Sequence, residues 1–146
     1  MEKKYILTDD VIDFNSHTLH RIKAVRDFDC VKAGDLGGFI ESEKNLDHDG
    51  DAWVTDSARV TGDAWVTGVA RIFGDADFAV ISGFGRVFRT TTFFRCKDNL
   101  VRCQCGCFYG TVDEFRSKVR ETHGSSKYAK EYLMIADLME LHFKED

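Results

Sequence analysis

A six-residue repeat in the middle of the chain constrains the fold more than any other feature. Residues 50 to 79 divide into five hexapeptides: GDAWVT, DSARVT, GDAWVT, GVARIF and GDADFA. The third position is always alanine, at Ala52, Ala58, Ala64, Ala70 and Ala76. The fifth position is always apolar, at Val54, Val60, Val66, Ile72 and Phe78. A period of six fits neither an amphipathic helix nor an alternating strand, so the repeat predicts short strands separated by regular corners.

The third and fifth positions of each hexapeptide lie two residues apart, so they face the same side of a short strand. We expect this side to face inward, with alanine where space is tight and a larger side chain filling the interior. The first position is Gly or Asp, which suits a corner that needs unusual backbone angles. Three strands make a coil of 18 residues. Residues 37 to 90 therefore predict a three-coil parallel β-helix.

An 18-residue coil places residues 18 apart on neighbouring rungs, about 4.8 Å from each other. This register places Arg71 directly above Trp53, on the neighbouring rung. It also predicts an outward ladder of alternating charge, formed by Glu41, Arg59 and Asp77. Trp53 and Trp65 point outward on different faces of the coil. Because Trp is enriched at protein interfaces, we predict both as interface residues. Scattered surface aromatic side chains are the alternative interpretation.

The two flanking segments have other patterns. Residues 1 to 36 predict an N-terminal β-hairpin, with a turn at Asn15-Ser16, that caps the first coil. Residues 91 to 146 predict a β-hairpin and two-helix module. Its strands extend over about residues 89 to 96 and 100 to 108, and its helices over about residues 111 to 123 and 126 to 143. Thr111 and Glu114 have the spacing of a capping box, and Gly124 suits a helix end. The predicted domains are therefore 1–36, 37–90 and 91–146 of a mainly β fold.

Charge and composition exclude several classes of protein. The chain has 20 Lys and Arg against 25 Asp and Glu, and this net charge of -5 argues against nucleic acid as the main partner. No apolar run approaches the roughly 18 residues that cross a bilayer, and the first residues lack the apolar core of a signal peptide. The cysteine count of 5 is odd. Together these features predict a cytoplasmic protein with no membrane partner.

A basic segment follows the repeat and is the main candidate for ligand binding. Hydroxyl groups, glycine backbone N–H groups and arginines are what an anionic ligand requires. The predicted ligand-binding residues are Gly85, Arg86, Arg89, Thr90, Thr91 and His123. The alternative is that this segment is an ordinary strand, since Thr is common in strands and a short G-x-G-R sequence arises by chance.

Cys103, Cys105 and Cys107 alternate along one predicted strand, and a zinc site is one interpretation of them. Cys96 and His123 would then complete the ligand set. On a straight strand, however, alternate residues lie about 6.6 Å apart, which is too far for one tetrahedral zinc ion unless the strand bends sharply. Small apolar thiols burying one strand face are the other interpretation, and we predict no metal and no cofactor. A catalytic cysteine is a further alternative, but no histidine partner can be placed beside it.

Residues 20 to 66, from HRIKAVRDFDCVKAGDLGGFIESEKNL to DHDGDAWVTDSARVTGDAWV, closely resemble the N-terminal part of hexapeptide-repeat proteins of the acetyltransferase or polymer-forming type. The tail, CGCFYGTVDEF…THG…EYL, resembles the C-terminal cap of short relatives in phages and prophages. The resemblance implies a left-handed coil and a homotrimer, although tryptophans on two faces would suit a dimer as well. Acyltransferases of this fold use a histidine base between subunits. His48, the one histidine in the repeat region, would be that base here.

The sequence and the resemblance together predict a non-enzymatic, phage-type binding protein that self-associates through its β-helix. It would engage a host protein, or sequester a small anionic ligand such as a nucleotide, and so counteract a host defence. Its location would be the host cytoplasm if a phage encodes it. The alternative function is a hexapeptide-type acyltransferase that uses acetyl-CoA and His48.

Overall fold

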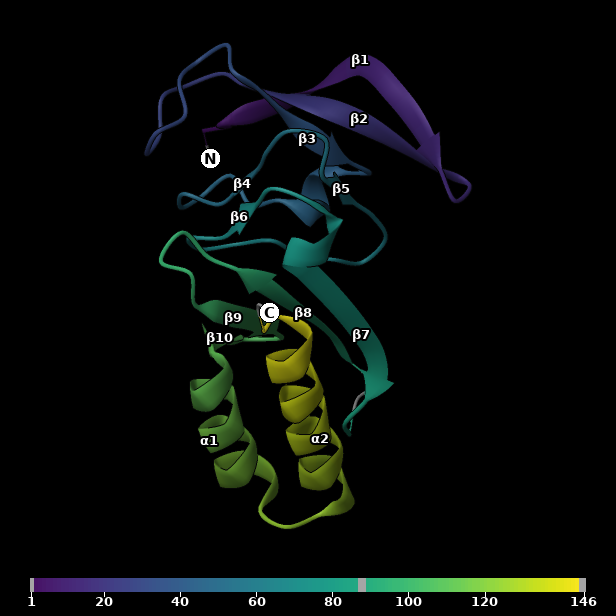
Figure 1. The fold of residues 1–146 in the computed structure, drawn as a ribbon, viewed down its shortest axis with the longest axis vertical. Coiled ribbons are helices and arrows are strands. Elements are labelled where there is room, and N and C mark those ends of the chain that lie inside the picture. Colours follow the sequence, from purple (N-terminus) through teal and green to yellow (C-terminus); the bar gives the residue numbers. More distant parts are fainter. Residues whose placement is uncertain (1, 87–88, 145–146) are drawn as a thin grey trace.

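The computed structural model describes residues 2–86 and 89–144 (Figure 1). The chain is arranged in layers along its longest axis. A hairpin of two long strands lies at the N-terminal end, followed by a region of very short strands. A four-stranded antiparallel sheet comes next, and two helices lie side by side at the other end.

The N-terminal hairpin consists of β1 (Tyr5–Phe14) and β2 (His17–Ala24), which pair antiparallel. Asn15 and Ser16 connect them with φ values of 51° and 69°, as a tight two-residue turn requires. The predicted hairpin and its turn are therefore confirmed. Next to β2, β3 (Leu36–Ile40) pairs antiparallel with it and parallel with β5 (Arg59–Val60), which gives a sheet of order β1-β2-β3-β5.

The hexapeptide region forms a tightly packed core. Eight of its inner positions are at most 1% exposed, namely Ala52, Val54, Ala58, Val60, Ala64, Val66, Ala70 and Ile72. The inward direction predicted for the first four hexapeptides is thus confirmed. In the fifth hexapeptide the prediction is wrong for Ala76, which is exposed, and Phe78 is only partly buried. Trp53, predicted to point outward, is 3% exposed.

The predicted three-coil, left-handed parallel β-helix over residues 37–90 is wrong. The described residues form several small sheets, none of them closed, and most of their strand pairs are antiparallel. Parallel pairing is limited to β3 with β5, β4 (Trp53–Val54) with β6 (Arg71–Ile72), and an isolated bridge. Arg71 pairs with Trp53 at the predicted offset of 18, but Arg59 pairs with Phe39 at an offset of 20.

The β-helix prediction fails for two reasons: the pairing offset is not constant, and the repeat ends before a third coil forms. Because Arg59 lies beside Phe39 and bonds to Asp75, the predicted charge ladder does not form. After the short 3-10 helix Asp75–Asp77, β7 (Phe78–Phe84) pairs antiparallel with β8 (Arg89–Arg95). A hairpin between adjacent segments closes a shorter loop than another coil would, so it costs less chain entropy. The predicted third coil is replaced by this hairpin.

The second sheet has the order β10-β9-β8-β7, with β9 (Val101–Cys105) and β10 (Phe108–Thr111). Helices α1 (Val112–His123) and α2 (Lys127–His142) follow. The predicted capping box is present. Thr111 N–H donates to Glu114 Oε1 at 2.8 Å, and Glu114 N–H donates to Thr111 Oγ1 at 3.2 Å. The helix ends at Gly124, as predicted. The helices and β8 thus lie close to their expected positions, whereas the single strand expected over about residues 100 to 108 is wrong, because β9 ends at Cys105 and the chain turns back as β10.

Two hydrophobic cores lie on opposite sides of β8. The first contains the hexapeptide residues together with Phe94 and Cys96, and the second contains Phe93 and the inner faces of both helices. Neighbouring residues of a strand point to opposite faces, so one strand can serve both cores. The second core lies between the sheet and the helices, where a pocket opens.

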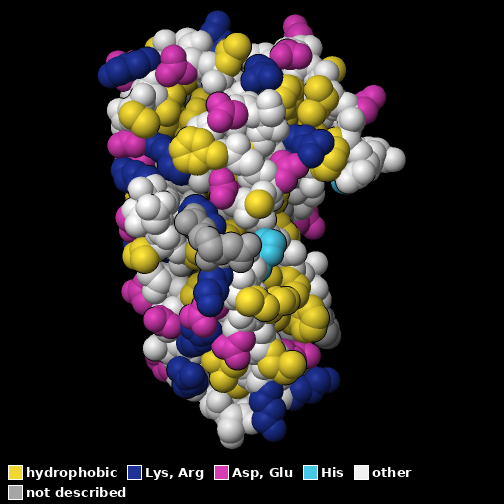
Figure 2. Space-filling model, in the orientation of Figure 1, with side chains coloured by type: hydrophobic (Ala, Val, Ile, Leu, Met, Phe, Trp, Pro, Cys, Tyr) yellow, Lys and Arg dark blue, Asp and Glu magenta, His cyan; other side chains and the backbone are white. Residues whose placement is uncertain are grey.

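Helix α2 also carries apolar side chains on its outer face. Met134, Leu138 and Leu141 are 71%, 53% and 70% exposed. Figure 2 shows hydrophobic side chains grouped over α2 and the neighbouring β7. No helix among the described residues is long and apolar enough to pass through a bilayer.

Candidate functional site

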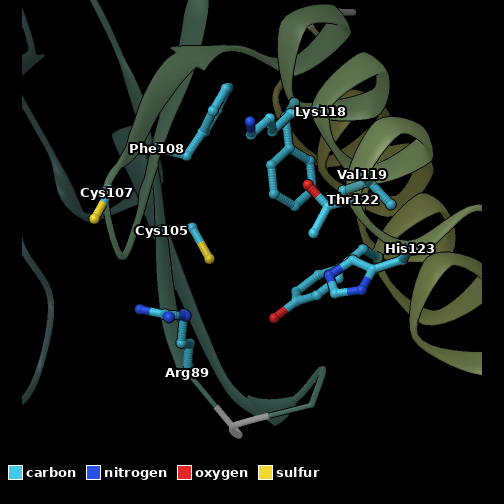
Figure 3. Close-up of a pocket in the computed structure, with 10 residues that line it drawn as sticks. Arg89, Cys105, Cys107, Phe108, Lys118, Val119, Thr122 and His123 are labelled. Atoms are coloured by element: carbon cyan, nitrogen blue, oxygen red, sulfur yellow. The ribbon is translucent and has the colours of Figure 1, made fainter.

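A pocket with a volume of about 220 Å³ lies between the β8–β9–β10 sheet and the two helices (Figure 3). We call it the helix–sheet pocket. Arg89 is the first residue of β8, Cys105 is the last of β9 and Phe108 is the first of β10. All three line the pocket, so the sheet forms one of its walls. Lys118 and His123 of α1 belong to the opposite wall. The pocket therefore joins segments that are far apart in the sequence.

Three cationic or protonatable side chains surround this pocket: Arg89, Lys118 and His123. The guanidinium group of Arg89 lies over Gly106, where a Cβ atom would collide with Nη1 of Arg89. Gly106 has a φ of 57°, so glycine both permits the turn and leaves space for the arginine. Lys118 Nζ lies 3.6 Å from Glu121 Oε1, but this pair is exposed and therefore weak.

Aromatic rings form the apolar part of the pocket. Phe108 and Phe115 have ring centroids 5.8 Å apart, and Phe115 meets Tyr132 edge-on at 5.6 Å. The ring of His123 stacks on Tyr132 at 5.8 Å. These spacings are typical of favourable aromatic pairs. The rings make a continuous apolar surface that ends at His123.

Hydroxyl and thiol groups line the region beneath His123. Tyr132 Oη donates a hydrogen bond of 3.2 Å to the carbonyl oxygen of Phe84, and burial raises the pKa of Tyr132 to about 12. The phenol is therefore a neutral donor near pH 7. Thr91 is 1% exposed, and its Oγ1 donates to Cys105 Sγ at 3.1 Å. In Figure 3 the sulfur of Cys105 points into the pocket.

A second pocket of about 250 Å³ adjoins the first and shares Thr122 and His123 with it. We call it the α2 N-terminal pocket, because Ser126, the residue that caps α2, lies in its wall. Arg86 also lines it, with Cζ 5.9 Å from the centroid of the Tyr128 ring. The two pockets thus meet at His123.

The structure brings together three of the predicted ligand-binding residues: Arg86, Arg89 and His123. Gly85 is buried in the turn, where its N–H donates to Glu131 Oε1 at 3.3 Å. The hydroxyl of Thr91 is engaged by Cys105, and Thr90 lines neither pocket. The pocket also contains residues that were not predicted from the sequence, among them Phe108, Lys118, Thr122 and Tyr132. The helical spacing of Phe115, Lys118 and Thr122 was the available signal, since it places them on one face of α1.

The cysteine-rich strand does not converge on one point. Cys103 is fully buried in the second core, and burial raises the pKa of its thiol. Cys105 and Cys107 both line the pocket, but Cys107 is exposed in the turn between β9 and β10 and its sulfur points away from the pocket centre in Figure 3. Cys96 belongs to the other core. Within residues 2–86 and 89–144, no three His, Cys, Asp or Glu side chains are grouped to hold a metal ion.

His48 lies far along the chain from these pockets, against the N-terminal hairpin. Its ring stacks on Tyr5 with centroids 4.2 Å apart. Nδ1 accepts a hydrogen bond from Lys4 N–H at 3.1 Å, which places the proton of a neutral ring on Nε2, 2.8 Å from Glu43 Oε1. Both ring nitrogens are therefore engaged within the chain. This hydrogen bond from His48 is also the main reason why the pKa of Glu43 is lowered.

The two predicted interface tryptophans occupy different environments. Trp53 is covered by the N-terminal segment, with Phe28 and Tyr5 packed edge-on at 5.3 Å and 6.3 Å between centroids. Trp65 is 40% exposed, and its Nε1 donates to Asp47 Oδ1 at 2.6 Å. Only Trp65 of the pair presents its ring to the surface.

Comparisons with known proteins assign no family to this fold and site: no protein-family model matches the chain, and no curated protein matches its sequence. The resemblance to hexapeptide-repeat proteins therefore stays a prediction. The case for function comes from the geometry of the two pockets.

Proposed function

We propose that the chain is a non-enzymatic binding protein that holds a small anionic ligand in the helix–sheet pocket. The observation that carries this proposal is the convergence of Arg89, Lys118 and His123 on one cavity from two separate elements (Figure 3). Charges of one sign gathered at a cavity raise its potential and attract the opposite charge. An anion is the ligand class that this arrangement favours.

The energetics support binding at this site. Each hydrogen bond between an arginine or lysine and an anion contributes about 1.5–3 kcal/mol when water is partly excluded. The rings of Phe108, Phe115 and Tyr132 would shield a bound ligand from water on one side, while Arg89 and Lys118 are exposed. Arg89 is held over Gly106, so its guanidinium group loses little further freedom on binding.

Acyl transfer through His48 has less support from the contacts. A general base needs a free ring nitrogen within reach of the substrate. In His48, Nδ1 already accepts from Lys4 and Nε2 already faces Glu43. The anion-binding residues lie on different elements, in the C-terminal part of the chain.

The resemblance to short phage proteins suggests the cellular role: sequestration of a host signalling nucleotide, which would counteract a host defence. We place the protein in the host cytoplasm, since its cysteines are all free thiols. A host-protein partner and self-association as a dimer or trimer are the further parts of the proposal. Trp65 is the exposed tryptophan available for such contacts.

Mass spectrometry of small molecules released from the purified, denatured protein tests the proposed function. We expect an anionic compound from the unchanged chain and at least about tenfold less from Arg89→Gln. Lys23→Gln, which removes one charge from exposed β2, is the matched control and should retain the compound. Equal or empty profiles for all three proteins, together with no binding of added phosphate or phenyl phosphate, would overturn the proposal.

A further inference from the structure

The two pockets that share Thr122 and His123 differ in chemistry, and this difference limits what one ligand spanning them can be. The part of the helix–sheet pocket around Phe108 and Phe115 is mainly aromatic, with Lys118 at its edge (Figure 3). The region near His123 is polar on both sides. Arg89 faces it from the sheet and Arg86 from the turn before β8. A ligand that fills both regions has to be amphiphilic.

The aromatic region fits a planar ring. Phe108, Phe115 and Tyr132 meet at tilted or edge-on angles of 56° and 88°, so their rings pack directly against one another and present one apolar surface to the pocket. Figure 3 shows open space beside this surface, between Cys105 on the sheet side and Thr122 and His123 of α1. Offset or edge-on contacts of a guest ring with such a surface are favourable.

The polar region fits a phosphate-like group. Arg86 lies in the turn after β7, Arg89 is the first residue of β8, and His123 is the last residue of α1. All three line one or both of the pockets. The wall also contains Ser126, where α2 begins, and this helix has 16 residues. The side chain of Ser126 already accepts from Ala129 N–H at 3.4 Å, so one of the first N–H groups of α2 is capped, while the helix dipole still favours an anion there. Arginine and helix N–H groups are both common ligands of phosphate.

Two nearby carboxylates already have partners. Glu131 accepts from the N–H of Gly85, and Glu121 lies beside Lys118 at the exposed rim. Arg89 lines the helix–sheet pocket and Arg86 lines the α2 N-terminal pocket. Two arginines, with His123 and a helix N-terminus, match a dianion better than a monoanion.

We infer that the site takes an aromatic monophosphate, with its ring against the apolar surface formed by Phe108 and Phe115 and its phosphate facing Arg86, Arg89 and His123. This inference rests on the proposed function and narrows it from anions in general to a two-part ligand. Inorganic phosphate would fill only the polar half. A neutral aromatic compound would fill only the apolar half.

The test is a set of titrations followed by calorimetry and by the backbone NMR signals of Thr122, His123 and Ser126. The probes are phenyl phosphate, inorganic phosphate and phenol. We expect phenyl phosphate to bind about tenfold more tightly than phosphate, because burial of its ring adds apolar contact. Phenol should bind more weakly than phenyl phosphate by a similar factor.

Phe108→Leu should bring the affinity for phenyl phosphate down to that for phosphate, and leave the affinity for phosphate unchanged. Phe73→Leu is the matched control, since Phe73 is exposed and lines neither pocket. Arg89→Gln should weaken the binding of both anions. Equal affinities for phosphate and phenyl phosphate would overturn the two-part ligand but leave the anion site intact. No binding of either anion would overturn the proposed function itself, and phenol binding as tightly as phenyl phosphate would overturn both.

Cysteine protection gives a second measurement that needs no variant. Cys105 points into the pocket, whereas Cys30 is exposed in the N-terminal part of the chain. Saturating phenyl phosphate should slow alkylation of Cys105 by iodoacetamide several-fold and leave the rate at Cys30 unchanged. Unchanged rates at both cysteines would contradict the inferred position of the ring.

Discussion

Phe93 and Phe94 are neighbours in β8 and are both completely buried, but they belong to different hydrophobic cores. Phe94 packs with the hexapeptide residues, while Phe93 meets Phe115 of α1 edge-on at 5.7 Å. The strand thereby joins the short-strand region to the sheet-and-helix region. The pocket is built on the Phe93 side.

Substitutions at these two residues should affect opposite halves of the protein. We expect Phe93→Leu and Phe94→Leu each to lower the free energy of unfolding by roughly 1–2 kcal/mol, through lost packing. NMR shifts should change in α1 and α2 for Phe93→Leu, and in the hexapeptide region for Phe94→Leu. Denaturant titration gives the energies. Identical shift patterns in the two variants would show that the cores are not separate.

The burial of the hexapeptide residues was predictable, but their pairing was not. Val54 and Val60 occupy the apolar fifth position of their hexapeptides, and such side chains are removed from water when the chain folds compactly. Which strand each one pairs with depends on long-range packing. Paired residues are 18 positions apart in the sequence for Trp53 and Arg71, but 20 positions apart for Phe39 and Arg59. Trp53 is buried because the N-terminal hairpin covers it, which the repeat cannot indicate.

The candidate site was predictable in part for a similar reason. Arg86 and Arg89 stand out in the sequence because charge, glycine and threonine gather there. Phe108 and Lys118 join them only because α1 folds back over the sheet, so no local pattern relates them. Local chemistry therefore identified the two arginines and His123, and tertiary packing supplied the other side chains of the pocket.

Gly85 is expected to be the most sensitive glycine near the pocket. It has a φ of 80°, and a Cβ atom there would collide with the hydroxyl group of Tyr132. Gly85→Ala should therefore cost about 2 kcal/mol or more in unfolding free energy and displace Tyr132. Gly83→Ala is the control, because Gly83 has a φ of 94° but nothing within 4 Å of the added atom, so strain alone should cost about 1 kcal/mol. Equal costs in thermal or denaturant unfolding would contradict the collision.

Asp29 is expected to stabilise the fold through Arg71. The side chain of Arg71 is 7% exposed, and it donates hydrogen bonds to Asp29 and to the carbonyl oxygen of Asp51. Asp29→Asn leaves this buried guanidinium group without its counter-charge and should cost roughly 1–3 kcal/mol in chemical unfolding.

The control for Asp29→Asn is Asp63→Asn, which removes the ion pair with Lys44. Both of these side chains are well exposed, at 63% for Lys44 and 72% for Asp63. Such pairs contribute little, so the change should be below about 0.5 kcal/mol. A cost for Asp29→Asn as small as that of the control would show that Arg71 is satisfied by other groups.

Lys4 should make stability depend on pH above neutrality. It is fully buried, its Nζ donates to the carbonyl oxygen of Ala52 at 2.7 Å, and burial lowers its pKa to about 8 from a usual value near 10.5. Between these two values the unfolded chain binds more protons than the folded chain, so this lysine contributes a free energy of unfolding that rises with pH. From pH 7 to pH 9 the contribution should rise by roughly 1–2 kcal/mol.

The comparison with Lys4→Met isolates this contribution, because other groups also titrate in the same range. Burial raises the pKa values of Tyr5 and Cys103, so both groups lower stability as pH rises, and they do so in both proteins. The unfolding free energy of the unchanged chain minus that of Lys4→Met should therefore rise as pH increases, by roughly 1–2 kcal/mol from pH 7 to pH 9. Urea titrations at pH 7, 8 and 9 give this difference directly. If it stays constant across the range, Lys4 is not held in the folded chain with a lowered pKa, and the burial of its ammonium group costs less than its contacts indicate.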